Sequence, residues 1–330
     1  MSGRGTILAL SSSKGGIGKT HLAVALSAAM AKEDHRVLLI DADLGNGIIS
    51  DRLGFYPRFN LVHFFLKEKN LEDLVEKTPY GFFFIGGEQG HMGLANLNYL
   101  QKMKFLRSFR RMRRDFDYVI VDLASGISRL VVDFVLLADK TMIVAYPRDL
   151  MSAYGSIRAC FSRFVQIEHR LSERMEGYEP RRIFSPIVVM NRVDDFHEGR
   201  AAFDALESAV ENRLQGRNSS RVMLEYGGAV FHDPAIFNKS EAKRCPLVTA
   251  SACSRVAFCV DSMARALTTP TSIKTLDTEQ YLKYTVQVLI DREEKVRKQL
   301  TSNMMKIYST RNPLQRRQKA VSSPALGRPV

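Results

Sequence analysis

Residues 6–20 read TILALSSSKGGIGKT, and this stretch decides the fold. It opens with an apolar run at residues 6–10, continues through a turn rich in serine and glycine, and leads into an alanine-rich helical pattern at residues 21–31. Glycines in such a turn let backbone N–H groups face inward, and the helix N-terminus adds the positive end of its dipole. The stretch therefore predicts a cradle for phosphate between the first strand and the first helix.

The chain around this stretch alternates short apolar runs with longer helical patterns, which is typical of βαβ units. The runs that predict strands lie at residues 6–10, 37–40, 82–85, 118–121, 141–145 and 187–190, with a weaker one at 222–224. Runs without polar residues suit strands that helices cover on both faces. The predicted fold is therefore α/β, a doubly wound and mainly parallel sheet of the P-loop NTPase type with a C-terminal helical extension.

Composition excludes several classes of protein. With 330 residues, 45% hydrophobic and 25% charged side chains, the chain can bury a sizeable core. The four cysteines contain no C-x-x-C pair, so we expect reduced thiols and neither a zinc module nor an iron–sulfur carrier. No stretch approaches eighteen apolar residues, so no membrane span is expected. These patterns indicate a cytoplasmic protein.

Residues at the ends of the predicted strands carry the chemistry of a nucleotide site. The lysine at the end of the turn, Lys19, is expected to reach the terminal phosphates, and Thr20 to offer a hydroxyl to Mg²⁺. Asp122 ends an apolar strand and is the expected metal carboxylate. The predicted cofactors are ATP and Mg²⁺, and the residues predicted to bind the nucleotide are Gly15, Gly16, Ile17, Gly18, Lys19, Thr20 and His21. Ser13 replaces the first glycine of the general P-loop pattern, but K-G-G-x-G-K-T is intact.

On these motifs, the chain resembles the MinD/ParA family of deviant Walker A ATPases over about residues 6–268. Lys14 is the residue that carries the resemblance. In that family the extra lysine crosses a dimer that sandwiches two nucleotides and contacts the partner's phosphates. The resemblance therefore implies an ATP-dependent homodimer in which Lys14 acts in trans and Lys19 in cis. The alternative for Lys14 is a solvated lysine of the loop.

Two further segments resemble the family's switch regions. Asp41 and Asp43 match switch I, which implies that Asp43 orients or deprotonates the attacking water and lies near Mg²⁺. Residues 122–126, DLASG, match switch II. Asn191 matches the asparagine that contacts adenine in the family; the alternative is a simple turn residue.

Within the family, the chain is most similar to the FlhG/FleN branch of MinD-like proteins. The supporting segments are residues 84–90, 93–97, 230–235 and 245–247. The resemblance implies a slow Mg-dependent ATPase that acts as a switch and regulates flagellar number or polar placement. It also implies protein partners in the flagellar or polar apparatus. The alternatives are a ParA-like ATPase that partitions DNA or another cargo, a MinD-like division-site regulator, and a scaffold with a vestigial site.

The net charge of +13 is concentrated in two patches. Residues 102–114 contain seven basic and no acidic residues, and residues 301–330 contain six basic and no acidic residues. In the first patch, Phe105, Phe109, Met112 and Phe116 form an apolar stripe, which leaves Arg107, Arg110, Arg111 and Arg114 on the other side. That arginine face is either a solvated helix surface or an anion surface for nonspecific DNA phosphates, acidic lipid or an acidic partner.

The predicted domain organisation has three parts. Residues 1–270 form the ATPase domain, residues 271–312 a long helix, and residues 313–330 a basic disordered tail. The end of the long helix carries apolar and basic residues together, which predicts peripheral contact with an anionic membrane surface, at the inner face of the cell membrane or a cell pole.

Overall fold

The computed structural model describes residues 5–91, 97, 99–214, 220–269, 298–299 and 301–302. The chain divides into two units, Met1–Thr278 and Glu279–Val330. The predicted long helix at 271–312 and the tail at 313–330 lie outside the described residues, apart from helical pieces at 298–299 and 301–302. Both therefore remain predictions, as does the expected membrane contact of that helix.

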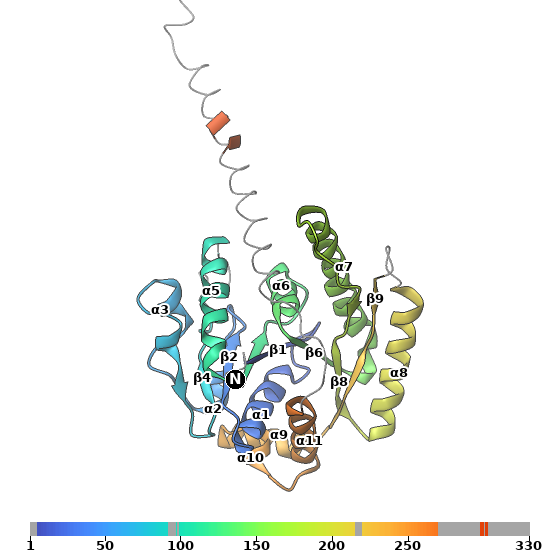
Figure 1. Cartoon of the computed structure of the whole chain (residues 1–330). Helices are drawn as coiled ribbons and strands as arrows, with labels where there is room; N and C mark the ends of the chain where they lie inside the picture. Colours follow the sequence, from blue (N-terminus) through green and yellow to red (C-terminus); the bar gives the residue numbers. More distant parts are fainter. Residues whose placement is uncertain are drawn as a thin grey trace, which may run out of the picture. The chain divides into compact units, whose positions relative to one another are not determined.

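The first unit is built on one mainly parallel sheet, as the sequence predicts (Figure 1). Its strand order is β10-β8-β6-β1-β5-β2-β4-β3. Every pair along this order is parallel except the last, where β3 runs antiparallel to β4. The strands are β1 Thr6–Ser11, β2 Val37–Ala42, β3 Glu76–Lys77, β4 Phe83–Ile85, β5 Tyr118–Leu123, β6 Lys140–Ala145, β8 Ile187–Val193 and β10 Glu225–Phe231.

Helices cover both faces of this sheet, which makes it doubly wound. Helices α1, α10 and α11 contact one another on one face, while α6, α7 and α8 form a row on the other (Figure 1). The helices are α1 Lys19–Lys32, α2 Ile49–Leu53, α3 Leu61–Phe65, α5 Tyr99–Met112, α6 Arg129–Leu137, α7 Leu150–Arg174, α8 Phe196–Arg213, α9 Pro234–Lys243, α10 Leu247–Ala250 and α11 Arg255–Thr268. Three short 3₁₀ turns are η1 Glu72–Leu74, η2 Arg113–Asp115 and η3 Pro147–Asp149.

Helix α1 shows why its sequence is rich in alanine. It lies between the sheet and the outer helices α10 and α11, so residues 22–30 are buried on every side. Small side chains allow this close approach on all faces of the helix. Its single buried hydroxyl, Ser27, donates to the carbonyl of Ala23 at 2.8 Å.

The predicted apolar stripe on α5 is confirmed. Phe105, Phe109, Met112 and Phe116 are all buried. The rings of Phe105 and Phe109 pack against Phe134 of α6, at centroid distances of 5.6 and 6.4 Å. The stripe therefore joins α5 to the row of helices on that face.

The weaker strand expected at 222–224 is shorter than predicted and does not belong to the main sheet. Val222 belongs to β9 (Arg221–Val222), which pairs with β7 (Ile183–Phe184) in a separate two-stranded sheet. The edge of the main sheet is β10, whose central glycines obscure the strand pattern. A Cβ at Gly227 would lie 2.5 Å from a methyl carbon of Ile187, so glycine is needed where β10 meets β8.

The thiols fit the sequence prediction. Cys160, Cys245 and Cys259 are buried and Cys253 is exposed, and all four are free. Over the described ranges, no three His, Cys, Asp or Glu side chains gather as a metal cluster. Within the same ranges, no helix is both long and apolar enough to cross a bilayer.

Candidate functional site

The predicted phosphate loop joins β1 to α1 at the carboxyl edge of the sheet. Gly16 and Gly18 adopt positive φ angles of 76° and 96°, a region that suits glycine, and Gly18 is the N-cap of α1. Lys19 and Thr20 then form the first turn of α1, with Thr20 half-buried. The N–H of Gly126 donates to the carbonyl of Ser12 at 2.8 Å, which ties the segment after β5 to the loop.

Lys19 is paired with Asp122 inside the protein. Its Nζ lies 2.6 Å from Oδ1 of Asp122, and the two side chains are 5% and 1% exposed. Two charges buried to this degree stabilise each other only while both are present. The structure thus brings together the lysine and the carboxylate that the sequence assigns to phosphate and metal.

Asp41 is a buried carboxyl to which the sequence assigns no separate role. It lies opposite Asp122 in the register of β2 and β5, and its Oδ2 accepts the N–H of Ile49 at 3.0 Å. Burial, followed by repulsion from Asp122, raises the pKa of Asp41 to about 8. Only strand pairing reveals this neighbour, because the two residues are 81 positions apart.

Asp43 lies half-buried beyond the end of β2, beside the same charges. Burial raises its pKa above the ordinary value, and the nearby ammonium of Lys19 opposes that rise. Backbone N–H groups of Asn46 and Gly45 also favour its charged form. Lys19 is therefore the positive charge that Asp41, Asp43 and Asp122 share at this edge.

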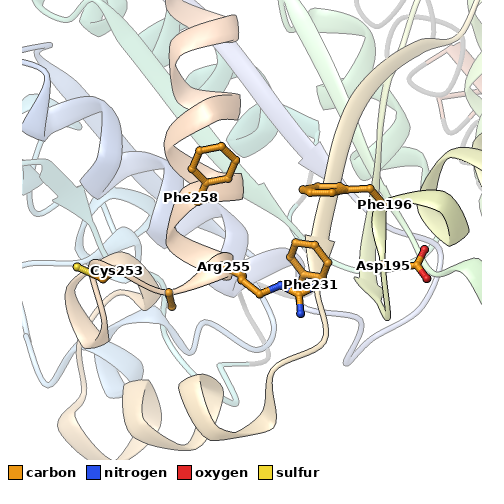
Figure 2. Close-up of a pocket in the computed structure, with 7 residues that line it drawn as sticks. Asp195, Phe196, Phe231, Cys253, Arg255 and Phe258 are labelled. Carbon is orange, nitrogen blue, oxygen red and sulfur yellow. The ribbon is translucent and has the colours of Figure 1, made fainter.

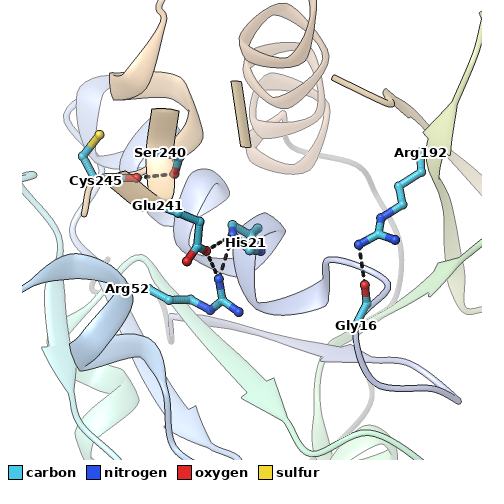
Figure 3. A network of polar contacts seen from close by, with 7 residues as sticks. All are labelled: Gly16, His21, Arg52, Arg192, Ser240, Glu241 and Cys245. Atoms are coloured by element: carbon cyan, nitrogen blue, oxygen red, sulfur yellow. Dashed lines mark hydrogen bonds and ion pairs between the residues drawn. The ribbon is translucent and has the colours of Figure 1, made fainter. Parts of the chain in front are cut away.

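The end of β8 holds the phosphate loop from the other side. Asn191 lies within the strand rather than in a turn, and its Nδ2 donates to the carbonyl of Ile17 at 2.5 Å. Next to it, the left-handed residue Arg192 donates to the carbonyl of Gly16 (Figure 3). Asn191 thus contacts the loop directly, and its contact with adenine stays a prediction.

Lys14 projects from the loop and is 63% exposed. Its Nζ forms an ion pair with Asp149 at the end of η3, a partner that the sequence does not indicate. This hydrogen bond, together with that from Ser152, holds the pKa of Asp149 below its usual range. Lys14 is therefore accessible at the carboxyl edge while Lys19 is buried.

His21 belongs to a polar network that links three helices (Figure 3). Its Nε2 lies 2.7 Å from Oε1 of Glu241 on α9 and 2.8 Å from Nη1 of Arg52 on α2. Arg52 and Glu241 also form an ion pair. Burial and the charge of Arg52 lower the pKa of His21. The sequence did not show this network, because its members come from distant segments without a shared motif.

A small aromatic hollow lies at the same edge, beyond the ends of β8 and β10 (Figure 2). Its volume is about 370 Å³. The guanidinium of Arg255 stacks 3.6 Å from the ring centroid of Phe231, and Phe196 contacts the same ring at 4.7 Å. Phe196 and Phe258 are more than half exposed. No sequence motif marked this hollow, which joins the start of α8 to the start of α11.

The residues around the phosphate loop fit a nucleoside triphosphate with Mg²⁺. The N-terminus of α1 and Lys19 offer positive charge to phosphate, and open space surrounds the position of a Cβ at Gly16. The hydroxyl of Thr20 and the carboxylates of Asp43 and Asp122 are oxygen donors of the kind that Mg²⁺ prefers. The fold and the site together define the class of protein, a P-loop nucleotide-binding protein.

Comparisons with known proteins agree with this class. The sequence matches the AAA_31 family, described as an AAA domain, over residues 5–176. The chain belongs to this family and is a P-loop ATPase of the MinD/ParA type, whose members use ATP and Mg²⁺.

Two curated relatives extend over most of the chain. The antiactivator FleN of Pseudomonas aeruginosa is 27% identical over 240 residues, which cover 72% of this chain and 78% of FleN. The flagellum site-determining protein YlxH of Helicobacter pylori is 24% identical over 228 residues, covering 69% of this chain and 70% of YlxH.

A solved structure supports the fold. The cell division ATPase MinD of Pyrococcus furiosus aligns with a TM-score of 0.58 and 20% identity, and the alignment covers 80% of this chain and 98% of the MinD chain. The expected doubly wound fold and the expected family are therefore confirmed.

Proposed function

We propose that this ATPase is a switch that dimerises around two Mg-ATP, hydrolyses them slowly and regulates flagellar number or polar placement. The observation that carries the proposal is the contrast between its two lysines. Lys19 is buried against Asp122, whereas Lys14 is exposed at the same edge of the sheet. A lysine that faces solvent beside the phosphate loop is available to a second subunit.

Each residue of the site has a role in this proposal. The loop from Gly15 to Gly18, Lys19 and His21 hold the phosphates, and Asn191 keeps the loop in shape through its bond to Ile17. Thr20, Asp43 and Asp122 would hold Mg²⁺, which when bound neutralises phosphate charge. Lys19 exchanges its pairing with Asp122 for phosphate. Asp43 orients the attacking water, and its raised pKa suits a group that accepts a proton.

Dimerisation would follow from differential binding. Lys14 leaves Asp149 and contacts the partner's nucleotide, so only a nucleotide with its terminal phosphate stabilises the pair. An exposed ion pair such as that of Lys14 with Asp149 contributes little because water and salt screen it, so the exchange is not prevented. Hydrolysis removes the terminal phosphate and releases the partner, which makes slow turnover a timer.

The flagellar assignment is supported by the relatives. FleN is described as an antiactivator and YlxH as a flagellum site-determining protein, and each aligns with more than two thirds of this chain. Partners in the flagellar or polar apparatus and a peripheral membrane position belong to the same proposal.

Light scattering tests the switch. The wild-type protein and Asp43→Ala are measured with no nucleotide, with ADP and with ATP, in the presence of Mg²⁺. We expect ATP alone to double the mass of both, and Asp43→Ala to hydrolyse ATP at least about ten-fold more slowly, since one oriented group contributes that much or more to the rate. A monomeric Asp43→Ala in saturating ATP would contradict the assigned role. Asp115→Asn, an exposed carboxyl far from the site, serves as the control.

A ParA-like DNA function is the second candidate, and one observation favours it. Arg107, Arg111 and Arg114 are exposed on or just after α5, opposite the buried phenylalanines. Such a face can attract DNA phosphates. Binding of the ATP dimer to plasmid DNA that weakens steeply with salt, and that is lost in an Arg107→Glu/Arg111→Glu variant, would support this function over the membrane-associated switch.

A further inference from the structure

A large hollow in the first unit lies far from the nucleotide edge. It has a volume of about 800 Å³ and is lined by the first residues of five strands. These residues are Thr6, Tyr118, Lys140, Ile187 and Glu225. Lys19 and Asp122 belong to the carboxyl edge, so the cavity occupies the opposite edge of the sheet. The small sheet of β7 and β9 contributes Ile183 and Phe184 to its wall.

The walls of the cavity are mainly aliphatic and aromatic. They come from α6, α7, the β7–β9 region and the end of α11, through Val135, Leu136, Phe164, Phe184 and Leu267. Ile183 and Met223 at its rim are 43% and 46% exposed, large for side chains of this type. Pockets for small molecules typically enclose about 300–1,000 Å³ and have walls of this kind. The cavity is therefore suited to a ligand with a long apolar part.

Three cations, Lys140, Arg181 and Arg182, line the cavity. Lys140 donates from Nζ to the carbonyl of Leu267 at 3.3 Å. Arg181 is held by Glu168 at 2.5 Å and lies over the ring of Phe164, at 5.0 Å from its centroid. Arg182 is exposed, and no ion pair is recorded for it among the described residues. These three side chains make the rim positively charged.

Two carboxyls, Asp139 and Glu225, also line the cavity. Asp139 is already bound to Arg113 at 2.5 Å. Burial raises the pKa of Glu225, which disfavours its charged form, although Lys140 opposes the shift. An acidic group at the rim would therefore meet the exposed Arg182, with Lys140 shared between it and Glu225.

We propose that this cavity binds one anionic amphiphile, an acyl chain that carries an acidic head group. The chain would cover the apolar walls, and the head group would pair with Arg182 and Lys140 at the rim. A polar ligand without a long apolar part would leave Ile183 and Met223 in contact with water. The same chemistry is found in a free fatty acid and in an acidic lysophospholipid.

Calorimetric titration of the full chain tests this site with three probes, the ionic ones below their micelle concentrations and the alcohol below its solubility limit. Palmitate and lysophosphatidylglycerol distinguish the two sources, and hexadecanol is the uncharged counterpart of palmitate. We expect one equivalent to bind and at least one acidic probe to bind about ten-fold more tightly than hexadecanol, or about 1.4 kcal/mol. Absence of binding by both acidic probes, or equal affinity for hexadecanol, would overturn the proposal.

Two variants locate the binding. Arg182→Glu reverses an exposed charge and should remove the preference for the acidic probe, with hexadecanol still bound. Ser185→Trp places a large ring at the exposed lining position Ser185 and should weaken every probe about ten-fold or more. Arg158→Glu makes the same charge change on the exposed side of α7, away from the cavity, and is the matched control.

Binding of a fluorescent ATP analogue shows that each variant is folded, since none of the three positions lies at the nucleotide edge. Unchanged affinity in both Arg182→Glu and Ser185→Trp would place the ligand elsewhere and refute the assignment. If Arg158→Glu and Arg182→Glu lost the preference for the acidic probe equally, net charge would explain the effect, and the assignment to this cavity would also be refuted. Because these readouts involve no hydrolysis or dimerisation, the outcome is independent of the proposed switch.

Discussion

Replacing Asp41 with asparagine should make this protein's free energy of unfolding depend less on pH. Asp41 is 1% exposed and lies opposite Asp122, and its pKa rises from 3.8 to about 8 in the folded chain. Between those two values the folded protein holds a proton on Asp41 that the unfolded chain has lost. Stability from this group is therefore complete below the unfolded pKa and falls as the pH rises toward about 8.

The size of the effect follows from the shift. Where only the folded state holds the proton, the free energy of unfolding falls by about 1.4 kcal/mol per pH unit, or about 2.7 kcal/mol from about pH 5 to about pH 7. Asparagine has nearly the same shape and can still accept the N–H of Ile49, but it has no charge to bury. Asp41→Asn should therefore gain stability over the wild type by that amount across this window.

Urea denaturation at several pH values, with EDTA and without nucleotide, measures this difference. Only the change of the mutant-minus-wild-type free energy with pH matters, because other titrating groups are common to both proteins. Asp115→Asn, an exposed carboxyl, is the control and should give a flat difference. Parallel curves for Asp41→Asn and wild type would refute the raised pKa.

Three further predictions concern the loop and the core. Lys14→Ala should bind ATP normally but show no ATP-dependent doubling of mass in sedimentation; a normal dimer with normal turnover would leave Lys14 as a solvated loop residue. Gly18→Ala places a Cβ 2.3 Å from Nδ2 of Asn191 at a φ of +96°, so we expect about 1–3 kcal/mol lower stability and at least ten-fold weaker ATP binding by calorimetry. Wild-type affinity would show that the loop tolerates the change. Phe105→Ala removes a ring that is 1% exposed and contacts Phe134, so the free energy of unfolding from urea denaturation should fall by about 3–5 kcal/mol. A loss below about 1 kcal/mol would contradict the packing.

The sequence predicted the parts of the fold that local patterns encode. The P-loop stands out because one strand, one turn and one helix lie consecutively, and the stripe of α5 because helical spacing places Phe105 and Phe109 on one side. It did not predict β10, because Gly227 and Gly228 interrupt the strand pattern where packing against β8 requires them. It also placed a strand at 222–224, where the chain forms the short β9 instead.

The candidate site divides in the same way. Lys19 and Thr20 were predicted from the glycine-rich turn and Asp122 from its position after an apolar run, because parallel strands carry such residues to one edge, whereas the role of Asp43 came from the resemblance to the family. The partner of Lys14, the contact of His21 with Glu241 and the bond from Asn191 to Ile17 were not predicted, since each joins residues more than a hundred positions apart. No periodicity records such pairs.

By itself, the sequence determined the class of the protein: a parallel α/β sheet with a phosphate loop, two acidic strand ends and a lysine before the glycines. These features are local, and local backbone preference and hydrophobic pattern are enough to produce them. Tertiary structure alone decided the electrostatics and the hollows. The pKa of Asp41 depends on which strand pairs with β2, and the cavity at the opposite edge is lined by residues of five strand starts, β7, α6, α7 and the end of α11. Both depend on distances between segments remote in sequence, which only the folded chain sets.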